Sequence, residues 1–228
     1  MHTSLHENNS SWEHIVVVDG PTKSTIPTFL LSCPHVVIIE LPVNVGQACA
    51  ANIGLSHAKA PYVTFLDDDD FLFPYGLDKR LEAIRVEKVK WSAAPLMDFR
   101  EDGGGIVFSK TSWQGLLNEG INRKGELLER WTNVEDTPLS HTLFVVDRKL
   151  TIALGGLSGL GQGEGIGFAI ALTAVSDGMV TPEPLYAYRQ HSGSVTASGD
   201  FEVMERYVKV AAKIRGEVLS NQPLESTY

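Results

Sequence analysis

The stretch YVTFLDDDDFLFP, residues 62–74, joins an apolar run to four consecutive aspartates, Asp67 to Asp70, and then becomes apolar again. The run before the aspartates has the aromatic and β-branched composition of a buried strand. Because side chains on a strand alternate between its two faces, we expect Asp67 and Asp69 to point the same way. Two carboxylates about 4 Å apart repel by about 4 kcal/mol at an effective dielectric constant of about 20. A divalent cation between them removes that repulsion, so the cluster predicts a metal site.

Hard oxygen ligands suit Mg²⁺ or Mn²⁺, which keep few protein ligands and share the rest with substrate phosphates. A competing interpretation is that the acids cap the following helix and face water. Four acids directly after a buried strand make that interpretation weaker than a metal site. An EF-hand needs glycine at its sixth position and glutamate at its twelfth. Counted from Asp67, those positions hold Leu72 and Asp78, which excludes an EF-hand.

Predicted strands and helices alternate around the aspartates. Continuous apolar runs, such as HIVVVDG at residues 14–20, suit a parallel sheet that is covered on both faces. Ligands in such α/β folds bind at the carboxyl ends of the strands, which is where the aspartates lie. No internal repeat or linker interrupts the chain, so we expect a single domain. The expected strands are 14–20, 35–41, 62–66, 90–99, 105–110, 142–150 and 186–196, the expected helices are 44–60, 75–89, 168–178 and 201–219, and a mobile glycine-rich loop is expected at 154–167.

The composition argues against several classes of protein. A net charge of −9 over 228 residues, with no Lys/Arg cluster, argues against a nucleic-acid partner. No window approaches about 18 uninterrupted apolar residues, so we expect no membrane span. The polar amino terminus is not a secretory signal, and Cys33 and Cys49 lack metal-type spacing. We therefore expect a cytoplasmic protein with two free thiols.

Three segments carry a resemblance to a known family. They are HIVVVDGPTKST (14–25), NVGQACAANIGLSHAKAPYVTFLDDDD (44–70) and PEPLYAYRQHSGSVT (182–196). In this order and spacing they resemble the family 2 glycosyltransferases of the GT-A fold, which transfer a sugar from a nucleoside diphosphate donor with inversion at the anomeric carbon. The resemblance implies a GT-A-like α/β domain over residues 1–228, with a mostly parallel sheet flanked by helices. Residues 1–90 would form the nucleotide-binding half and residues 91–228 the acceptor-side half.

The resemblance also implies nucleotide contacts. Asp19 would hydrogen-bond the base, which is most often uracil in this family, and Asn44, Gly46 and Asn52 would shape the wall beneath the nucleotide. Each has a structural alternative as a turn, helix-start or packing residue. The expected donor is thus a nucleoside diphosphate sugar, UDP-linked in the commonest case, and the hydroxyl acceptor stays unidentified.

The acid cluster and a segment near the carboxyl terminus would hold the diphosphate. By resemblance, Asp67 and Asp69 form a D-x-D pair with Asp69 as the direct ligand of Mn²⁺ or Mg²⁺. Asp70 would orient Asp69 or contact the sugar. Arg189 and His191 lie two residues apart and face one side of an extended segment. Arg189 would neutralise the diphosphate, and His191 would be a further metal ligand or diphosphate contact. Without the acid cluster, the better interpretation of the segment YRQH (188–191) would be the end of a surface strand.

The acceptor hydroxyl needs a base, which in this family is normally the aspartate of a Glu-Asp pair just before a helix. The matching segment, GQGEGIGFAIALTAV (161–175), has Glu164 followed by Gly165, so Glu164 is the candidate base. The alternative is that the base is lost and the chain binds without turnover. Glu135 and Asp136 form another Glu-Asp pair, which lies too early to align but is conceivable as a repositioned base. His141 and the other upstream histidines lack such neighbours and are interpreted as structural.

Other departures leave rival interpretations open. The family normally begins with a strand ending in Pro-Thr-x-Asn, which we expect to be absent here. Three interpretations stay open: a wrongly placed start codon, a natural truncation, or an edge completed by another subunit and hence a homo-oligomer. Ala51 stands where an arginine often precedes Asn52. A non-catalytic relative, kept as a binding or scaffolding subunit, is the first rival. A nucleotidyltransferase is less favoured because the sequence lacks a glycine- and lysine-rich phosphate loop.

Overall fold

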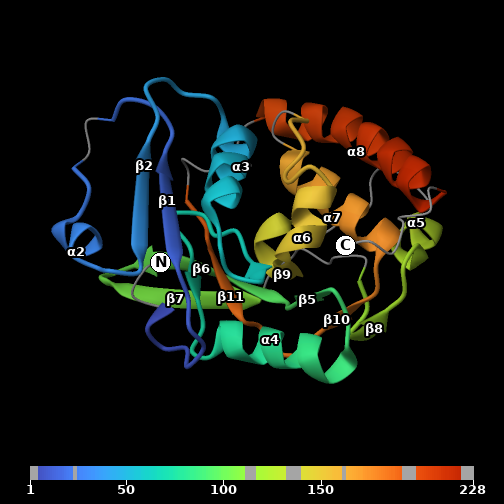
Figure 1. The fold of residues 1–228 in the computed structure, drawn as a ribbon, viewed down its shortest axis with the longest axis horizontal. Helices are drawn as coiled ribbons and strands as arrows, with labels where there is room; N and C mark the ends of the chain where they lie inside the picture. The colour runs from blue at the N-terminus through green and yellow to red at the C-terminus, as the bar shows by residue number, and fades with distance from the viewer. Residues whose placement is uncertain are drawn as a thin grey trace.

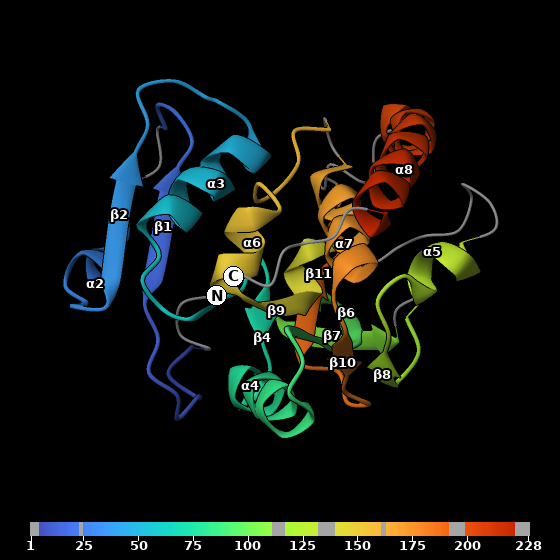
Figure 2. The same cartoon turned by 45° about the vertical axis from the view of Figure 1, so that its right-hand side comes forward.

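The computed structural model describes residues 5–22, 25–110, 117–131, 140–160, 163–191 and 199–221. In two views the larger sheets lie between helices, with α4 on one side and α3, α6, α7 and α8 on the other (Figures 1 and 2). This layering confirms the expected α/β class. The helices are α2 (Thr28–Leu31), α3 (Gln47–His57), α4 (Gly76–Glu87), α5 (Glu126–Arg130), α6 (Arg148–Ala153), α7 (Glu164–Val175), α8 (Gly199–Ser220) and the short 3-10 helix η1 (His141–Leu143).

The strands of the described residues form three sheets. β1 and β2 pair with each other, five strands follow the order β3-β9-β5-β10-β8, and four follow the order β4-β11-β6-β7. The bounds are β1 (His14–Val18), β2 (Val36–Glu40), β3 (Tyr62–Val63), β4 (Phe71–Leu72), β5 (Trp91–Ala93), β6 (Leu96–Asp102), β7 (Gly105–Lys110), β8 (Gly120–Asn122), β9 (Phe144–Asp147), β10 (Gly178–Val180) and β11 (Tyr186–Arg189).

Strand pairing is more mixed than the expected mostly parallel sheet. In the part of the chain that the structure describes, β1–β2, β5–β10 and β6–β11 pair in parallel, and the other five pairs are antiparallel. A parallel pair needs a long crossover, whereas a short turn joins antiparallel strands. Gly103 and Gly104 supply such a turn between β6 and β7, with φ angles of +58° and +85° that favour glycine.

Several predicted strands are shorter in the structure, and the one predicted at 90–99 is divided into β5 and β6. The segment predicted at 62–66 is a strand only in β3, and the one at 142–150 only in β9. Helix α6 follows β9 directly because Asp147 caps it, accepting a hydrogen bond of 3.0 Å from the amide of Leu150. Asp147 therefore ends the strand and starts a helix within what we expected to be one extended segment.

The glycine-rich loop expected at 154–167 is also shorter, because α7 begins inside it at Glu164. Glycine disfavours helix by about 1 kcal/mol relative to alanine when exposed. The first turn of α7 is not exposed: Glu164, Ile166 and Gly167 are all buried. Packing of this turn against the rest of the domain therefore overrides its weak helix propensity.

The main core lies between α7 and the five-stranded sheet. Trp91, Phe144 and Phe168 are fully buried, and Phe144 makes edge-on ring contacts with both, at centroid distances of 5.3 and 6.4 Å. A second, smaller cluster joins α5, α7 and α8. Its buried members are Leu127, Trp131, Ile166, Ile170 and Ala212.

β1 and β2 stand outside both clusters: none of their side chains belongs to either one. Helix α3 covers β1 through Gly54, where an added Cβ would lie 3.3 Å from Val17. At its start, β1 is fastened by Glu13, whose carboxylate accepts hydrogen bonds of 2.6 and 2.7 Å from the amides of Lys59 and Ala60. A helix and one carboxylate thus hold β1 to the segment that precedes β3.

Both cysteines are free thiols, as expected, with Cys33 half-buried and Cys49 exposed. Among the described helices, none combines the length and the apolar character that crossing a membrane requires.

Gly216 sets how closely α8 approaches α7. A Cβ there would lie 2.6 Å from Ile170 and 2.8 Å from Leu128. We expect Gly216→Val to lower the free energy of unfolding by about 1–3 kcal/mol, because overpacking displaces core side chains. Urea unfolding measures this loss. Gly159→Ala is the matched control, since a Cβ at Gly159 meets nothing within 4 Å; equal effects of the two changes would contradict the packing described here.

Candidate active site

The four aspartates lie in a turn rather than on a strand. After β3 the chain leaves strand geometry, and the amide of Asp70 donates to the carbonyl of Asp67 at 3.3 Å. Strand alternation therefore does not set their directions, contrary to the reasoning from sequence. Their burial differs instead: Asp70 is buried, Asp68 is exposed, and Asp67 and Asp69 are half-buried.

Asp70 is held inside the protein. Its carboxylate accepts a hydrogen bond of 2.7 Å from the amide of Arg189 and another from the Tyr186 hydroxyl. Burial raises the pKa of Asp70 to about 7, although both hydrogen bonds oppose that rise. Burial, followed by the charge of Asp70, raises the pKa of Tyr186 well above its ordinary value. These contacts tie the aspartate turn to β11.

Asp67 lies where negative charge is concentrated. Burial, followed by the charges of Asp69, Asp68 and Glu164, raises its pKa to about 6. A hydrogen bond of 3.0 Å from the side chain of Gln47 opposes this rise. Glu164, distant in sequence, therefore lies close enough to act on Asp67.

The structure brings together two of the predicted metal ligands. Nε2 of His191 lies 2.9 Å from a carboxylate oxygen of Asp69, and both side chains are partly exposed. Arg189 takes a different direction, because its guanidinium pairs with Glu101 on β6 at 2.6 Å. The predicted contact of Arg189 with a diphosphate stays a prediction.

The described residues contain no group of three or more His, Cys, Asp or Glu side chains arranged to hold a metal. The donor chemistry nevertheless fits Mg²⁺ or Mn²⁺, which accept one or two protein carboxylates and take their remaining ligands from water and phosphate. Asp69 and His191 form such a partial set, and the crowded carboxylate of Asp67 adds negative charge beside it.

The predicted nucleotide wall is built by hydrogen bonds within the protein. Asp19 accepts from the amides of Val45 and Gly46 at 2.7 and 2.9 Å, and the side chain of Asn44 donates to the carbonyl of Asp19 at 3.1 Å. Asn52 exchanges two hydrogen bonds of 2.9 and 2.8 Å with the backbone of Leu157. These contacts give Asp19 and Asn52 structural roles, and their roles toward a nucleotide stay predictions.

The model of the Glycosyl transferase family 2 matches residues 1–155. The chain belongs to this family. Among curated relatives, an uncharacterized glycosyltransferase of Haemophilus influenzae is 36% identical over 80 residues, covering 34% of this chain and 32% of the relative. The putative teichuronic acid biosynthesis glycosyltransferase TuaG of Bacillus subtilis is 29% identical over 106 residues, covering 45% and 42% of the two chains. The chain thus spans well under half the length of these relatives.

Solved structures support the fold. Staphylococcus aureus TarS 1–349 in complex with UDP-GlcNAc matches with a TM-score of 0.65 at 17% identity, covering 94% of this chain and 61% of that one. TarS 1–349 in complex with UDP matches with a TM-score of 0.62 at 15% identity, covering 96% and 64%. The expected GT-A-like architecture is confirmed.

The start of α7 leaves little room for a side chain at Gly165, the position where the resemblance leads us to expect an aspartate. A Cβ at Gly165 would lie 2.7 Å from Nδ1 of His141 and 3.1 Å from its backbone amide. Glu164, one residue earlier, is only 5% exposed, and its Oε2 has no hydrogen-bond partner. Burial raises the pKa of Glu164. The Glu135–Asp136 pair lies outside the described residues.

His141 and Tyr186 belong to this site, although the sequence reasoning gave them no role there. The imidazole of His141 packs edge-on against Phe65 at 5.7 Å, two residues before Asp67, and its Nδ1 is buried without a partner. Tyr186 also interacts with the side chain of Thr142, next to His141. In the sequence, the one indication that Tyr186 belongs to the site is its position in the segment 182–196, three residues before Arg189.

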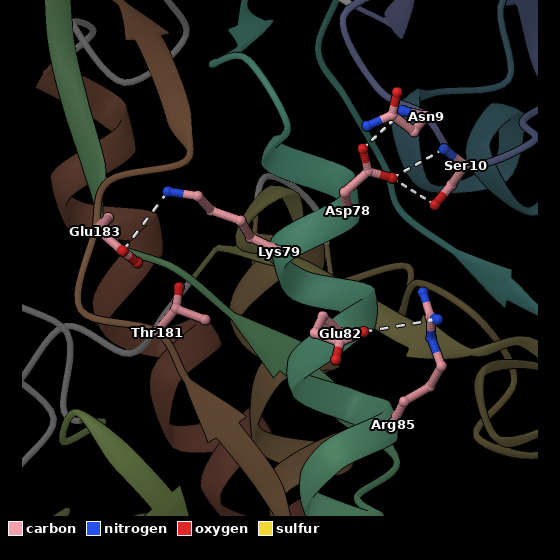
Figure 3. A pocket seen from close by; sticks show the side chains of 8 residues that line it. All are labelled: Asn9, Ser10, Asp78, Lys79, Glu82, Arg85, Thr181 and Glu183. Atoms are coloured by element: carbon pink, nitrogen blue, oxygen red, sulfur yellow. Dashed lines mark hydrogen bonds and ion pairs between the residues drawn. The ribbon is translucent and has the colours of Figure 1, made fainter.

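A polar hollow of about 570 Å³ lies along α4 (Figure 3). Its charges are already paired within the protein: Lys79 with Glu183 and Arg85 with Glu82, each at 3.6 Å. Asp78 accepts hydrogen bonds from Asn9 and Ser10 and so fastens the amino-terminal segment to α4. None of the residues that line this hollow was predicted as a site residue, and the hollow is not the candidate site.

His141 should make stability depend on pH. Burial lowers its pKa from 6.5 to about 4. Between these values the unfolded chain binds a proton at His141 that the folded protein excludes, so the contribution of His141 to the free energy of unfolding falls as the pH falls, by at most about 3 kcal/mol. Urea unfolding across this range measures the slope. Asp67 and Asp70, whose pKa values are raised, contribute with the opposite sign over the same range, and they remain in both proteins. His141→Phe should therefore lower the slope of the free energy of unfolding against pH relative to the unmodified protein, because only the contribution of His141 is lost; identical slopes would refute the assignment.

Proposed function

We propose that this chain is a metal-dependent, inverting glycosyltransferase that moves a sugar from a nucleoside diphosphate donor, UDP-linked, to a hydroxyl acceptor. The observation that carries the proposal is the 2.9 Å contact of Asp69 with His191, two residues from distant parts of the chain, next to Asp67, on which the charge of Glu164 acts. Membership of the family supports glycosyl transfer. A fold like that of TarS, which was solved with UDP-GlcNAc and with UDP, supports the choice of donor.

The donor side needs positive charge. The chain has a net charge of −9 and its aspartates are crowded, so a diphosphate would be repelled unless a cation intervened. Asp69 and His191 would hold Mn²⁺ or Mg²⁺, which supplies positive charge for the leaving diphosphate. Asp70 does not need to touch the donor for this purpose. Its hydrogen bonds to Tyr186 and Arg189 keep the aspartate turn in place.

The acceptor side needs a proton acceptor. Glu164 has an oxygen without a hydrogen-bond partner and a pKa raised by burial, which makes its carboxylate a better base than one in water. As the acceptor oxygen attacks the anomeric carbon, the carbon–oxygen bond to the diphosphate breaks and the hydroxyl proton passes to Glu164. His141 fills the space beside Gly165, which leaves Glu164 as the carboxylate at the start of α7.

The close approach of His141 to Gly165 favours a second candidate function. His141 leaves no room for a carboxylate side chain at position 165, so if Glu164 does not serve as the base, the domain binds a nucleotide sugar without transferring it. Such a protein would act as a binding or scaffolding subunit. Turnover separates the two candidates, whereas donor binding is common to both.

Asp69→Asn should weaken UDP binding in the presence of Mn²⁺ by at least about tenfold, because a metal ligand is lost. Calorimetry with UDP and Mn²⁺ measures this change. Asp102→Asn is the matched control: this aspartate lies at the end of β6 and its side chain is 65% exposed. Failure of the unmodified protein to bind UDP at millimolar concentrations would overturn the proposed donor.

Glu164→Gln should reduce hydrolysis or transfer of a UDP-sugar by about 100-fold or more while leaving UDP affinity within about twofold, because only proton transfer is lost. Release of UDP measures turnover. Glu183→Gln, at an exposed glutamate of the α4 hollow, is the control. Donor binding without any turnover in the unmodified protein would select the binding subunit instead.

A further inference from the structure

The outer face of α8 carries a row of exposed apolar side chains. Tyr207 is 73% exposed, and Val210, Ile214 and Val218 are 44%, 57% and 52% exposed. They follow one another at intervals of three and four residues, so they lie on one side of the helix. We call these four residues the α8 stripe. Contiguous exposed apolar side chains mark surfaces that bind another molecule.

The opposite side of α8 is already used. Ala212 is fully buried, Lys209 is 4% exposed, and Gly216 lies against Ile170 of α7. Both views place α8 at the rim of the molecule with α7 on its inner side (Figures 1 and 2). The inner face of α8 is therefore packed against α7, whereas its outer face is apolar and exposed. Packing within one copy of the described chain accounts for the inner half alone.

Spacing and side-chain type suit a helix as the partner. Intervals of three and four are those of the a and d positions of a coiled coil, where a facing helix covers each apolar side chain. A second copy of the chain offers such a helix with the same stripe. An interface made by one patch meeting itself has twofold symmetry, the commonest arrangement in soluble oligomers.

Two charged residues decide the direction of the pairing. Arg206 and Glu217 are both exposed and lie eleven residues apart, which is close to three helical turns, so they form one row beside the stripe. In a parallel pair they would stay about 16 Å apart along the axis and could not meet. An antiparallel pair centred near Ala212 brings Arg206 of one copy opposite Glu217 of the other, twice. The same register brings Tyr207 towards Val218 and Val210 towards Ile214.

We propose that two copies of this chain associate through antiparallel pairing of their α8 helices, along the α8 stripe and the Arg206–Glu217 row. A single pair of helices buries less than the roughly 800 Å² per partner of a standard interface. The dimer is accordingly a weak one that dissociates on dilution through the micromolar range. Its formation does not depend on the proposed sugar transfer.

Sedimentation velocity over a concentration series tests the association. The unmodified protein should shift from monomer to dimer as its concentration rises. Ile214→Glu should move the midpoint at least about tenfold higher, since it places a charge in the apolar contact. Val86→Glu is the matched control because Val86 is an equally exposed apolar residue, 62% exposed, on α4. A monomer at every concentration, or a dimer that Ile214→Glu leaves unchanged, would overturn the proposal.

Charge exchange tests the direction. Arg206→Glu and Glu217→Arg should each weaken the dimer several-fold, because each places like charges opposite one another. The double variant should regain the original affinity, since the pairs re-form with their signs exchanged. Loss without recovery in the double variant would rule out the antiparallel register. Circular dichroism of each variant confirms the fold, and a monomeric protein that binds anionic lipid vesicles would assign the stripe to a membrane surface instead.

Discussion

The geometry of the candidate site depends on one buried carboxylate. Asp70 is 1% exposed, and it accepts hydrogen bonds from the backbone of Arg189 and the hydroxyl of Tyr186. These bonds join the turn that follows β3 to β11, two segments more than a hundred residues apart in the chain. Because β11 is held in register, His191 arrives next to Asp69. A buried carboxyl group without hydrogen-bond partners would be unfavourable, so these contacts stabilise the fold as well as the site.

The second half of the site comes from the first turn of α7. Here the protein accepts features that would be unfavourable elsewhere: a buried glutamate with an unpartnered oxygen, a buried imidazole with an unpartnered nitrogen, and glycine in a helix. Their concentration beside Asp67 is unlike the surrounding core, where aromatic and aliphatic side chains pack closely. Unsatisfied groups and shifted pKa values tend to collect at functional sites. This turn and the aspartate turn therefore form one site.

Local patterns in the sequence predicted several regular elements and part of the arrangement of the candidate site. The apolar runs became β1 and β2, the alanine-rich segment became α3, and the acid cluster and the Arg189–His191 segment met as expected. What failed depends on tertiary contacts that no local pattern records. Burial extended α7 into the glycine-rich segment where a loop was expected. Glu101, far along the chain, pairs with the guanidinium of Arg189, a contact that the sequence did not indicate. His141 became part of the site only because Gly165 leaves it room.

The separate β1–β2 sheet affects how the domain moves. A two-stranded sheet is marginally stable by itself, and this one contributes no side chain to either core cluster. Local opening therefore needs less free energy there than in β5 or β9, and the backbone amides of β1 and β2 should exchange with deuterated solvent first. Asp19 lies at the end of β1 and holds the Val45–Gly46 loop. A ligand seated against that loop would suppress local opening of the β1–β2 sheet, so part of its binding free energy would be used to order these two strands.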